Sequence, residues 1–463
     1  MAQRIQLNMY NLVRWLVGLA LGFYFRRIER FHAERVPEAG PVLFTSNHPN
    51  SVTDSFVIGA SVPRKVNFVA TAQMFRYRPF KWLLTRCGVI PINRRQDNPR
   101  AMHTVADTFE ACFRVLEQGE AVGIFPEGVT YNDSQMREVK TGAARIALEL
   151  EHRHEGRLGL QVVPAGLTYS AKQIYRSDVL VNFGEPIRAA DFLEGYKERR
   201  HECVHTLTAE IERRIQSLIL HLPQLEHARV VAGVKRLYLD RLLLGQSISH
   251  EPMSPRAEEL LVTQQIVAAV EHVSETEPER AAAFAAKLDA YERRLRRLRI
   301  SDEHLAMFPD KGRLMRRSIG GAALAVLGAP VALYGWLHRM VPYAAVKQAV
   351  RGFTQRGKRK AQTSAVAILA GIIAFGTFYG LCVAGVHAWL GWPASLWYAL
   401  SLPVASLIAH YYLRELRRLG ASLRNTFVLM RAPMAARRLL AVRAELVAEI
   451  EAVRGKGNVK RET

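Results

Sequence analysis

The chain has 463 residues, which is longer than one typical domain and enough to bury a large core. Lys and Arg outnumber Asp and Glu by 64 to 42, and the net charge of +22 predicts an anionic partner. Residues 319–337 hold no charged side chain, and 364–413 hold neither Asp, Glu, Lys nor Arg. Apolar stretches of this length argue against a soluble nucleic-acid-binding protein and favour an anionic membrane surface as the partner.

The N-terminal segment, 1–34, has the pattern of an amphipathic helix. Its apolar run Leu16–Phe25 is closed by two arginines and is too short to span a bilayer. We expect residues 5–27 to form a helix that lies in the membrane interface. A helix that packs its apolar face on the protein core explains the same pattern, and this alternative stays open.

Residues 35–190 alternate short apolar runs with helical stretches. Strands are expected at Val42–Thr45, Val66–Ala70, Ala121–Phe125, Leu160–Thr168 and Val179–Phe183. Helices are expected around 77–86, 100–118 and 142–153. The alternation predicts an α/β domain with a largely parallel sheet and flanking helices, in which the strand ends are the expected place for chemistry.

The first expected strand runs into TSNHPNSVTD, residues 45–54, which places His48 six positions before Asp54. An oriented imidazole is a common general base at neutral pH, and a carboxylate on its second nitrogen fixes the tautomer and stabilises the imidazolium. Six residues turn an ideal helix by about 240°, so a loop must bring the two side chains together. A polar turn without catalytic chemistry is the alternative explanation of these residues.

Two arginines follow the strand-like piece GVIPIN, and they are the next candidates. Guanidinium groups bind phosphate oxygens in pairs, so Arg94 and Arg95 suit a phosphorylated acceptor. Pro164 interrupts the apolar strand VVPAGLTYS further along the chain. Such a break suits a wall for an acyl chain or a bend at a pocket.

The segment IFPEGVTYND places Glu127 at the carboxyl end of a buried strand. There its carboxylate can hold an acceptor hydroxyl or orient neighbouring groups, and Gly128 lets the backbone approach a ligand closely. Lys140 stands at the start of a helix, where free N–H groups favour an anion. As structural alternatives, Glu127 caps a neighbouring segment and Thr141 is a plain N-cap.

Together these residues resemble the four blocks of the glycerolipid acyltransferase family, which includes lysophosphatidic acid and glycerol-3-phosphate acyltransferases. The blocks are Asn47-His48 with Asp54, Gly88 with Pro91 and Arg94, Phe125–Gly128, and Val163–Gly166. The resemblance implies that His48 is the base on the acceptor hydroxyl and that Asp54 is its partner. It also implies that Arg94 and the Glu127-Gly128 loop bind the phosphate and hydroxyl groups of the acceptor.

The spacing of the first block departs from the common pattern of the family. Five residues separate His48 from Asp54, whereas four are common. A branch similar to fungal glycerol-3-phosphate and dihydroxyacetone-phosphate acyltransferases carries the longer spacing, and residues 167–187 also resemble that branch. The choice of acceptor among glycerol 3-phosphate, dihydroxyacetone phosphate and lysophosphatidate is left open by this departure.

The resemblance implies transfer of a fatty acyl chain to a hydroxyl of a phosphoglycerol in phospholipid biosynthesis, with neither a metal nor a cofactor. The expected partners are a thioester donor (acyl-CoA or acyl carrier protein), a phosphorylated glycerol acceptor and anionic membrane lipids, and no nucleic acid. Two alternatives remain. One is an acyltransferase for another lysophospholipid, and the other is a non-catalytic membrane scaffold whose α/β domain only binds lipid.

Residues 191–317 are charged and helical in period, and they contain a zinc-like motif. HECVH, at 201–205, places two histidines one helical turn apart, and Glu226 follows as a possible third ligand. In such a charged helix, solvated histidines are the preferred explanation. The four cysteines form no CxxC pair, so neither a disulfide framework nor a cysteine zinc site is expected, which agrees with a reducing compartment.

Two apolar segments, 364–390 and 394–412, each fit a spanning helix and are joined by an uncharged Gly-Trp-Pro. The preceding residues 338–363 have seven Lys and Arg and no acid, and three arginines follow the second segment. The positive-inside rule therefore places both ends of this hairpin in the cytoplasm. We expect an integral membrane protein whose catalytic domain lies on the cytoplasmic side.

Residues 319–337 have basic groups on both sides, and Gly328-Ala-Pro330 stands in the middle. A re-entrant or interfacial hairpin fits these charges better than a third span. The expected organisation is then an interfacial helix at 1–34, the α/β domain at 35–190, a charged helical region at 191–317, a membrane-associated region at 318–418, and a basic C-terminal helix and tail at 419–463.

Overall fold

The computed structural model describes residues 2–76, 78–92, 103–128, 136–172, 174–222, 224–245, 254–308, 311–354 and 363–459. The chain forms two compact units, and each is described by itself. Unit 1 consists of Met1–Pro223, Glu251–Leu260 and Gly352–Ile368, and unit 2 consists of Gln224–His250, Leu261–Arg351 and Leu369–Thr463.

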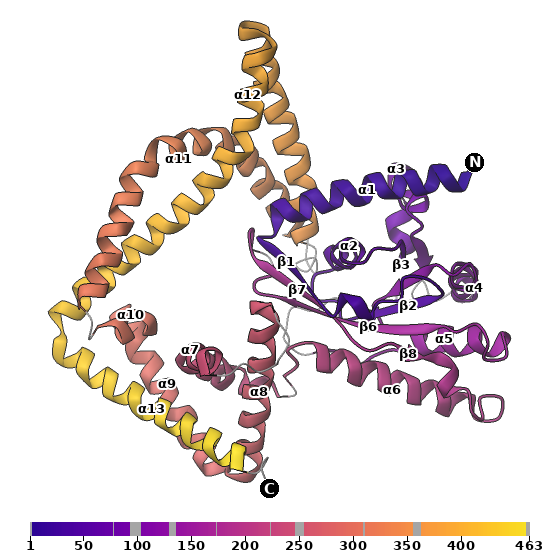
Figure 1. Ribbon diagram of the computed structural model, residues 1–463, viewed down its shortest axis with the longest axis horizontal. Helices are drawn as coiled ribbons and strands as arrows, with labels where there is room; N and C mark the ends of the chain where they lie inside the picture. Colours follow the sequence, from indigo (N-terminus) through magenta and orange to yellow (C-terminus); the bar gives the residue numbers. More distant parts are fainter. Residues whose placement is uncertain are drawn as a thin grey trace. The chain divides into compact units, whose positions relative to one another are not determined.

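Unit 1 is built on one sheet, whose strands follow the order β1-β7-β6-β2-β5-β3-β4 with β8 paired to β6 (Figure 1). The strands are β1 (Arg27–Phe31), β2 (Val42–Ser46), β3 (Val66–Thr71), β4 (Ile90–Ile92), β5 (Ala121–Ile124), β6 (Gln161–Tyr169), β7 (Asp178–Phe183) and β8 (Ile187–Arg188). Strand β6 runs antiparallel to β7 and β8, and the other paired strands run parallel. The prediction of a largely parallel sheet is confirmed.

Helices cover both faces of this sheet (Figure 1). They are α1 (Ala2–Tyr24), α2 (Val52–Ser61), α3 (Arg78–Arg86), α4 (His103–Glu117), α5 (Gly142–Arg153) and α6 (Arg200–Leu218). Leu43 packs in a hydrophobic cluster with α4, α5 and α6, whereas Phe44 packs in a second cluster with α1 and α2. Neighbouring residues of a strand point to opposite faces, and β2 is therefore buried along its whole length.

The sheet and its covering helices extend beyond the expected domain limits of 35 and 190. Strand β1 pairs in parallel with β7, so the sheet begins at Arg27. At the other end, Leu207, Ile211 and Ile215 of α6 belong to the core under the sheet. The apolar pattern of the sequence does not indicate that either element belongs to the domain. Strand β1 is an edge strand with the charged sequence RIERF, and α6 is charged on its outer face.

Helix α1 packs one face on the protein core and exposes another apolar face. Its last turns bury Leu21 and Tyr24 in the core beside α2. A different face exposes large apolar side chains at helical spacing, namely Leu12, Trp15, Leu16, Leu19 and Phe23. The packed face positions the helix on the domain, and the exposed face remains available for the predicted contact with a membrane interface.

Unit 2 is helical throughout its described part. Its helices are α7 (Ala228–Gly245), most of α8 (Pro255–Thr276), α9 (Pro278–Leu298), α10 (Asp302–Met307), most of α11 (Lys311–Thr354) and α12 (Thr363–Arg431), and α13 (Pro433–Val459). Leu288 and Leu295 of α9 pack with Leu446 of α13 in a hydrophobic core. The buried carboxylate of Asp302 receives bonds from the Arg443 guanidinium, so one charged pair joins this core.

Helix α12 is long and apolar enough to cross a membrane, by its length and composition. Its backbone leaves helical geometry at Gly391, where φ is 73° and ψ is −172°. This break lies at the Gly-Trp-Pro sequence that separates the two expected spans. Glycine suits the position because other residues rarely adopt such a positive φ.

Helix α11 differs from the expectation of a hairpin broken near Gly328-Ala-Pro330. It is one helix from Lys311 to Thr354 that contains Pro330. A Cβ at Gly335 would lie 2.0 Å from the carbonyl oxygen of Ala405 in α12, and a Cβ at Gly328 would lie 3.0 Å from the Tyr412 ring. The glycines therefore serve close packing of two helices, a pattern typical of apolar helix pairs, rather than a break in the chain.

Candidate active site

The turn between β2 and α2 brings the predicted pair together. Ser51, just before α2, has a φ of 54°, and this bend folds the chain back so that His48 reaches Asp54 in the first turn of the helix. His48 Nδ1 lies 3.0 Å from Asp54 Oδ2, and the two side chains are 13% and 0% exposed. His48 Nδ1 has no hydrogen-bond partner among the described residues, so this is a close contact rather than an aligned hydrogen bond.

Asp54 is held by two further donors. The backbone N–H of Asn50 donates to Asp54 Oδ2 at 2.7 Å, and the Tyr169 hydroxyl donates to Oδ1 at 2.6 Å. Burial and the neighbouring carboxylate raise the pKa of Tyr169 well above its ordinary value, which keeps its hydroxyl protonated as a donor. Tyr169 lies in the apolar strand VVPAGLTYS and in the segment that resembles one family branch, but its bond to Asp54 was not predicted.

Glu127 also acts on His48, through the backbone. Its Oε1 accepts the N–H of His48 at 2.9 Å, and its Oε2 accepts the N–H of Arg137 at 3.0 Å. Burial raises the pKa of Glu127, against the opposing effect of these two bonds. Of the two roles considered for Glu127, the structure shows the orientation of neighbouring groups, while contact with an acceptor hydroxyl stays a prediction.

The imidazole of His48 lies against an aromatic ring. The ring centroids of His48 and Phe125 are 4.0 Å apart with an interplanar angle of 19°, so the rings are stacked. Phe68 stacks behind Phe125 at 6.0 Å. This stack limits rotation of the imidazole and forms an apolar wall beside it. The sequence placed Phe125 in a motif but gave no signal of this contact.

The loop after Glu127 brings Gly128 beside Lys140. Gly128 has a φ of 73°, and a Cβ there would lie 2.9 Å from Lys140 Nζ. The backbone N–H of Lys140 donates to the carbonyl of Pro126 at 3.0 Å, which fixes the exposed lysine next to the Pro-Glu-Gly turn. Thr141 occupies the N-cap position of α5, but its side chain makes no capping bond.

Pro164 and the two arginines complete the predicted set. Pro164 is buried inside β6, where it pairs with Thr45 of β2 and its carbonyl accepts the N–H of Gly184 at 2.8 Å. Its place is therefore the sheet beneath the site. Arg94 and Arg95 lie outside the described residues.

The loop that follows β6 connects the site to the start of α12. The carbonyl of Lys172 accepts the side-chain amide of Asn50 at 3.3 Å and the hydroxyl of Ser364 at 2.7 Å. Ser364 is fully buried, and Ile368 in the next turn packs in the core with α1 and α2. The first turns of the candidate spanning helix are thus fixed to unit 1 near Asp54.

The zinc-like motif gains no support from the structure. His201 and His205 lie on the exposed face of α6 with ring centroids 4.3 Å apart. Within the described ranges no group of three or more His, Cys, Asp or Glu side chains is arranged to hold a metal ion. The two rings are therefore best explained as solvated histidines of a charged helix.

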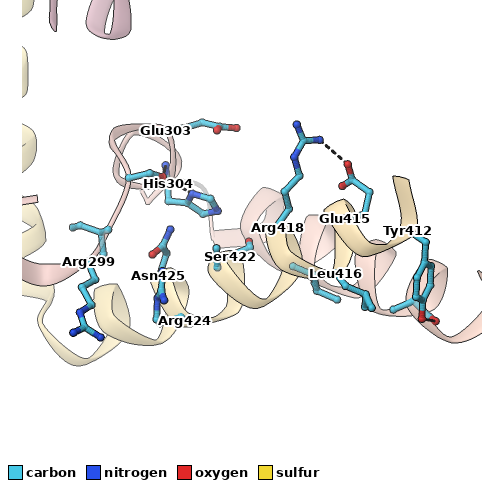
Figure 2. A pocket seen from close by; sticks show the side chains of 15 residues that line it. Arg299, Glu303, His304, Tyr412, Glu415, Leu416, Arg418, Ser422, Arg424 and Asn425 are labelled. Carbon is cyan, nitrogen blue, oxygen red and sulfur yellow. Dashed lines mark hydrogen bonds and ion pairs between the residues drawn. The ribbon is translucent and has the colours of Figure 1, made fainter. Parts of the chain in front are cut away.

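A pocket of about 560 Å³ lies in unit 2 (Figure 2). It is lined by residues 299–301, Glu303 and His304, by Ala325 of α11, and by residues 412–425 of α12, where Arg418 pairs with Glu415. All of its lining residues belong to unit 2, whereas every predicted site residue belongs to unit 1. None of the predicted site residues lines this pocket.

The fold and the site define an α/β protein in which a histidine lies between a buried carboxylate and an aromatic ring. Residues 5–168 match the family model described as Acyltransferase. This match begins well before residue 35, in agreement with the inclusion of β1 in the sheet.

Three individual proteins illustrate the likeness. Glycerol-3-phosphate O-acyltransferase 1 of Saccharomyces cerevisiae is 22% identical over 318 residues, which are 50% of this chain and 42% of that protein. The 1-acyl-sn-glycerol-3-phosphate acyltransferase of Streptococcus pneumoniae is 26% identical over 216 residues, which are 45% of this chain and 72% of that protein. The crystal structure of the 1-acyl-sn-glycerophosphate acyltransferase from Thermotoga maritima is 16% identical with a TM-score of 0.33, covering 46% of this chain and 80% of that chain.

Residues 5–168 are thus similar to the acyltransferase domains of glycerol-3-phosphate and 1-acyl-sn-glycerol-3-phosphate acyltransferases. The chain spans less than half the length of the yeast relative.

Proposed function

We propose that this protein is a membrane-bound acyltransferase that moves a fatty acyl chain from an acyl thioester to a hydroxyl of a phosphoglycerol acceptor. The observation that carries the proposal is the contact of 3.0 Å between His48 Nδ1 and the buried Asp54 carboxylate, inside a domain of this family. The names of the relatives support the choice of acceptor class, because they describe acyl transfer to glycerol 3-phosphate and to its 1-acyl derivative.

The reaction needs a base for the acceptor hydroxyl. Because Nδ1 of His48 faces Asp54, Nε2 is the nitrogen that takes the proton as the acceptor oxygen attacks the thioester carbonyl. The tetrahedral intermediate then collapses, the C–S bond breaks, and the proton on Nε2 passes to the leaving thiolate. Neither a covalent enzyme intermediate nor a metal is needed for this balance.

The surroundings of His48 match these steps. The imidazolium that forms lies beside the Asp54 carboxylate, which stabilises it. Phe125 on the ring face and Glu127 on the backbone N–H hold the imidazole at the same place before and after proton transfer. Such preorganisation lowers the barrier because little rearrangement is needed in the transition state.

Cationic side chains are assigned to the acceptor phosphate. Lys140 is exposed next to Gly128, on the loop whose Glu127 binds the His48 backbone. Its ammonium group, together with Arg94 and Arg95, supplies the charge that a phosphate ester requires. Glycerol 3-phosphate, dihydroxyacetone phosphate and lysophosphatidate all carry this phosphate near a free hydroxyl.

The protein is proposed to be integral to the membrane, with unit 1 on the cytoplasmic side. The support is the candidate spanning helix α12, the basic residues at both ends of its apolar part and the positive-inside rule. The contact of Ser364 with Lys172 fixes the start of this helix near the site, which would keep the site close to lipid substrates. The exposed apolar face of α1 is assigned to the same membrane surface.

The proposal is tested with membranes from cells that express the full chain. They are incubated with labelled acyl-CoA or acyl carrier protein and one acceptor at a time: glycerol 3-phosphate, dihydroxyacetone phosphate, lysophosphatidate and other lysophospholipids. Membranes from cells without the chain are the control. We expect labelled product with a phosphoglycerol acceptor. Product only with other lysophospholipids would change the acceptor class, and no product with any pair would contradict the proposal.

A further inference from the structure

We infer that Tyr169 is a positioning residue, which holds the Asp54 carboxylate in the orientation that serves His48. The inference rests on the proposed function and names a residue that acts through Asp54, without touching the substrate. Tyr169 ends β6, 115 positions along the chain from Asp54, and its hydroxyl donates to Asp54 Oδ1 at 2.6 Å.

The two carboxylate oxygens of Asp54 have different partners. Oδ2 faces His48 Nδ1 and also accepts the N–H of Asn50. On Oδ1, the Tyr169 hydroxyl is the one bond that the described residues provide. A carboxylate held at both oxygens cannot turn about its χ2 angle, so Tyr169 prevents a rotation that would carry Oδ2 away from the imidazole.

The position of Tyr169 is itself rigid. Its backbone pairs with Val179 across the antiparallel β6–β7 ladder. Its ring packs against Phe25, with centroids 5.8 Å apart, at the hydrophobic cluster beneath α1. A hydroxyl on such a support can fix a neighbouring carboxylate more firmly than a loop residue can.

The bond also sets the charge that His48 experiences. A hydroxyl that donates to one oxygen draws negative charge toward itself and away from the other oxygen. Its removal would leave Asp54 Oδ2 more negative, and the neighbouring imidazolium more stable. Tyr169 therefore influences both the geometry and the proton affinity of His48, and a merely structural tyrosine would affect neither.

The first test uses Tyr169→Phe, which keeps the ring and its packing. In membranes with the full chain, we expect kcat to fall by roughly tenfold to a hundredfold, as for loss of a hydrogen bond to a charged group. KM for both substrates should stay within about threefold of wild type. In an Asp54→Asn background the same change should cost little more, because Tyr169 acts through the carboxylate.

A second measurement does not depend on turnover. Diethyl pyrocarbonate modification of His48, followed by peptide mass spectrometry across pH, reports the protonation of that one imidazole. We expect the midpoint to move to higher pH in Tyr169→Phe. Tyr175→Phe is the matched control, because the Tyr175 ring contacts Tyr24 in the same unit. This variant should leave the midpoint of His48 modification at its wild-type value.

The outcomes separate this inference from the proposed function. An unchanged kcat with an unchanged modification midpoint in Tyr169→Phe would overturn the positioning role. An equal loss of kcat in the Asp54→Asn background would overturn the claim that Tyr169 acts through Asp54. A wild-type chain without acyl transfer would contradict the proposed function, while the modification midpoint would still decide the role of Tyr169.

Discussion

Asp54→Asn changes one atom type at the centre of the proposed mechanism. The Asp54 side chain is fully buried, and two donors bond to its oxygens: the Asn50 N–H and the Tyr169 hydroxyl. The His48 ring approaches Oδ2 at 3.0 Å. An amide has one accepting oxygen and one donating nitrogen. Whichever way it turns, at least one donor then faces an NH₂ group, and the negative charge beside His48 is lost.

The magnitude follows from these contacts. Loss of a hydrogen bond to a charged group costs about 1.5–3 kcal/mol, which is roughly tenfold to 150-fold in rate when the loss falls on the transition state. The wrong imidazole tautomer adds to this cost, and in serine proteases the corresponding change lowers kcat by about 10⁴. We therefore expect Asp54→Asn to lower kcat by about 10² to 10⁴, with KM values within about threefold of wild type.

The assay is acyl transfer in membranes that contain equal amounts of each variant, determined by immunoblot. Asp191→Asn is the matched control, because Asp191 is an exposed carboxylate that pairs with Arg188, and this variant should keep wild-type turnover. If Asp54→Asn keeps a kcat within about threefold of wild type, the carboxylate has no catalytic duty and the reasoning fails.

Three further changes test other parts of the structure. Gly128→Ala should lower the thermal midpoint and reduce kcat, since left-handed backbone costs about 1–2 kcal/mol for other residues and the new Cβ would lie 2.9 Å from Lys140 Nζ; a wild-type midpoint would contradict this. Burial alone would raise the pKa of Asp178, but the ion pairs with Arg26 and Arg256 outweigh burial and lower that pKa. The stability that these ion pairs contribute is therefore present above pH 3.8 and is lost as pH falls through the folded-state pKa of Asp178. Unfolding of purified chain in detergent across pH should show that acid-sensitive loss, and Arg256→Ala should diminish it. Gly335→Ala should weaken the packing of α11 on α12 and lower the thermal midpoint, whereas Gly376→Ala, which meets no atom within 4 Å, should not; equal effects would refute the close packing.

The sequence predicted the central strands because burial on both faces makes them continuous apolar runs. Strands β2, β5 and β7 are of this kind, and their observed limits lie within one residue of the expected ones. Strand β1 was missed, since an edge strand with the sequence RIERF has no apolar run to signal it. Apolar patterning therefore reports burial, and it is silent where a strand is only half covered.

The candidate site shows the same division. Motif spacing identified His48 and Asp54, but their contact depends on the positive φ of Ser51. A serine in the sequence does not predict this backbone conformation. The duty of Tyr169 depends on the parallel pairing of β2 with β6, which brings together residues that are distant in sequence. The glycines of α11 were interpreted as a break because Gly and Pro disfavour isolated helices, whereas a neighbouring helix can require them.

The most direct test of the central claim is the acyl transfer rate of His48→Ala, measured in membranes beside His201→Ala, which removes an exposed histidine of α6. General base catalysis contributes about 10² to 10⁴ to a rate. We predict that His48→Ala loses at least about a hundredfold in kcat, with normal expression and membrane association, and that His201→Ala retains the wild-type rate. A His48→Ala variant as active as His201→Ala would contradict the role of this histidine as the base.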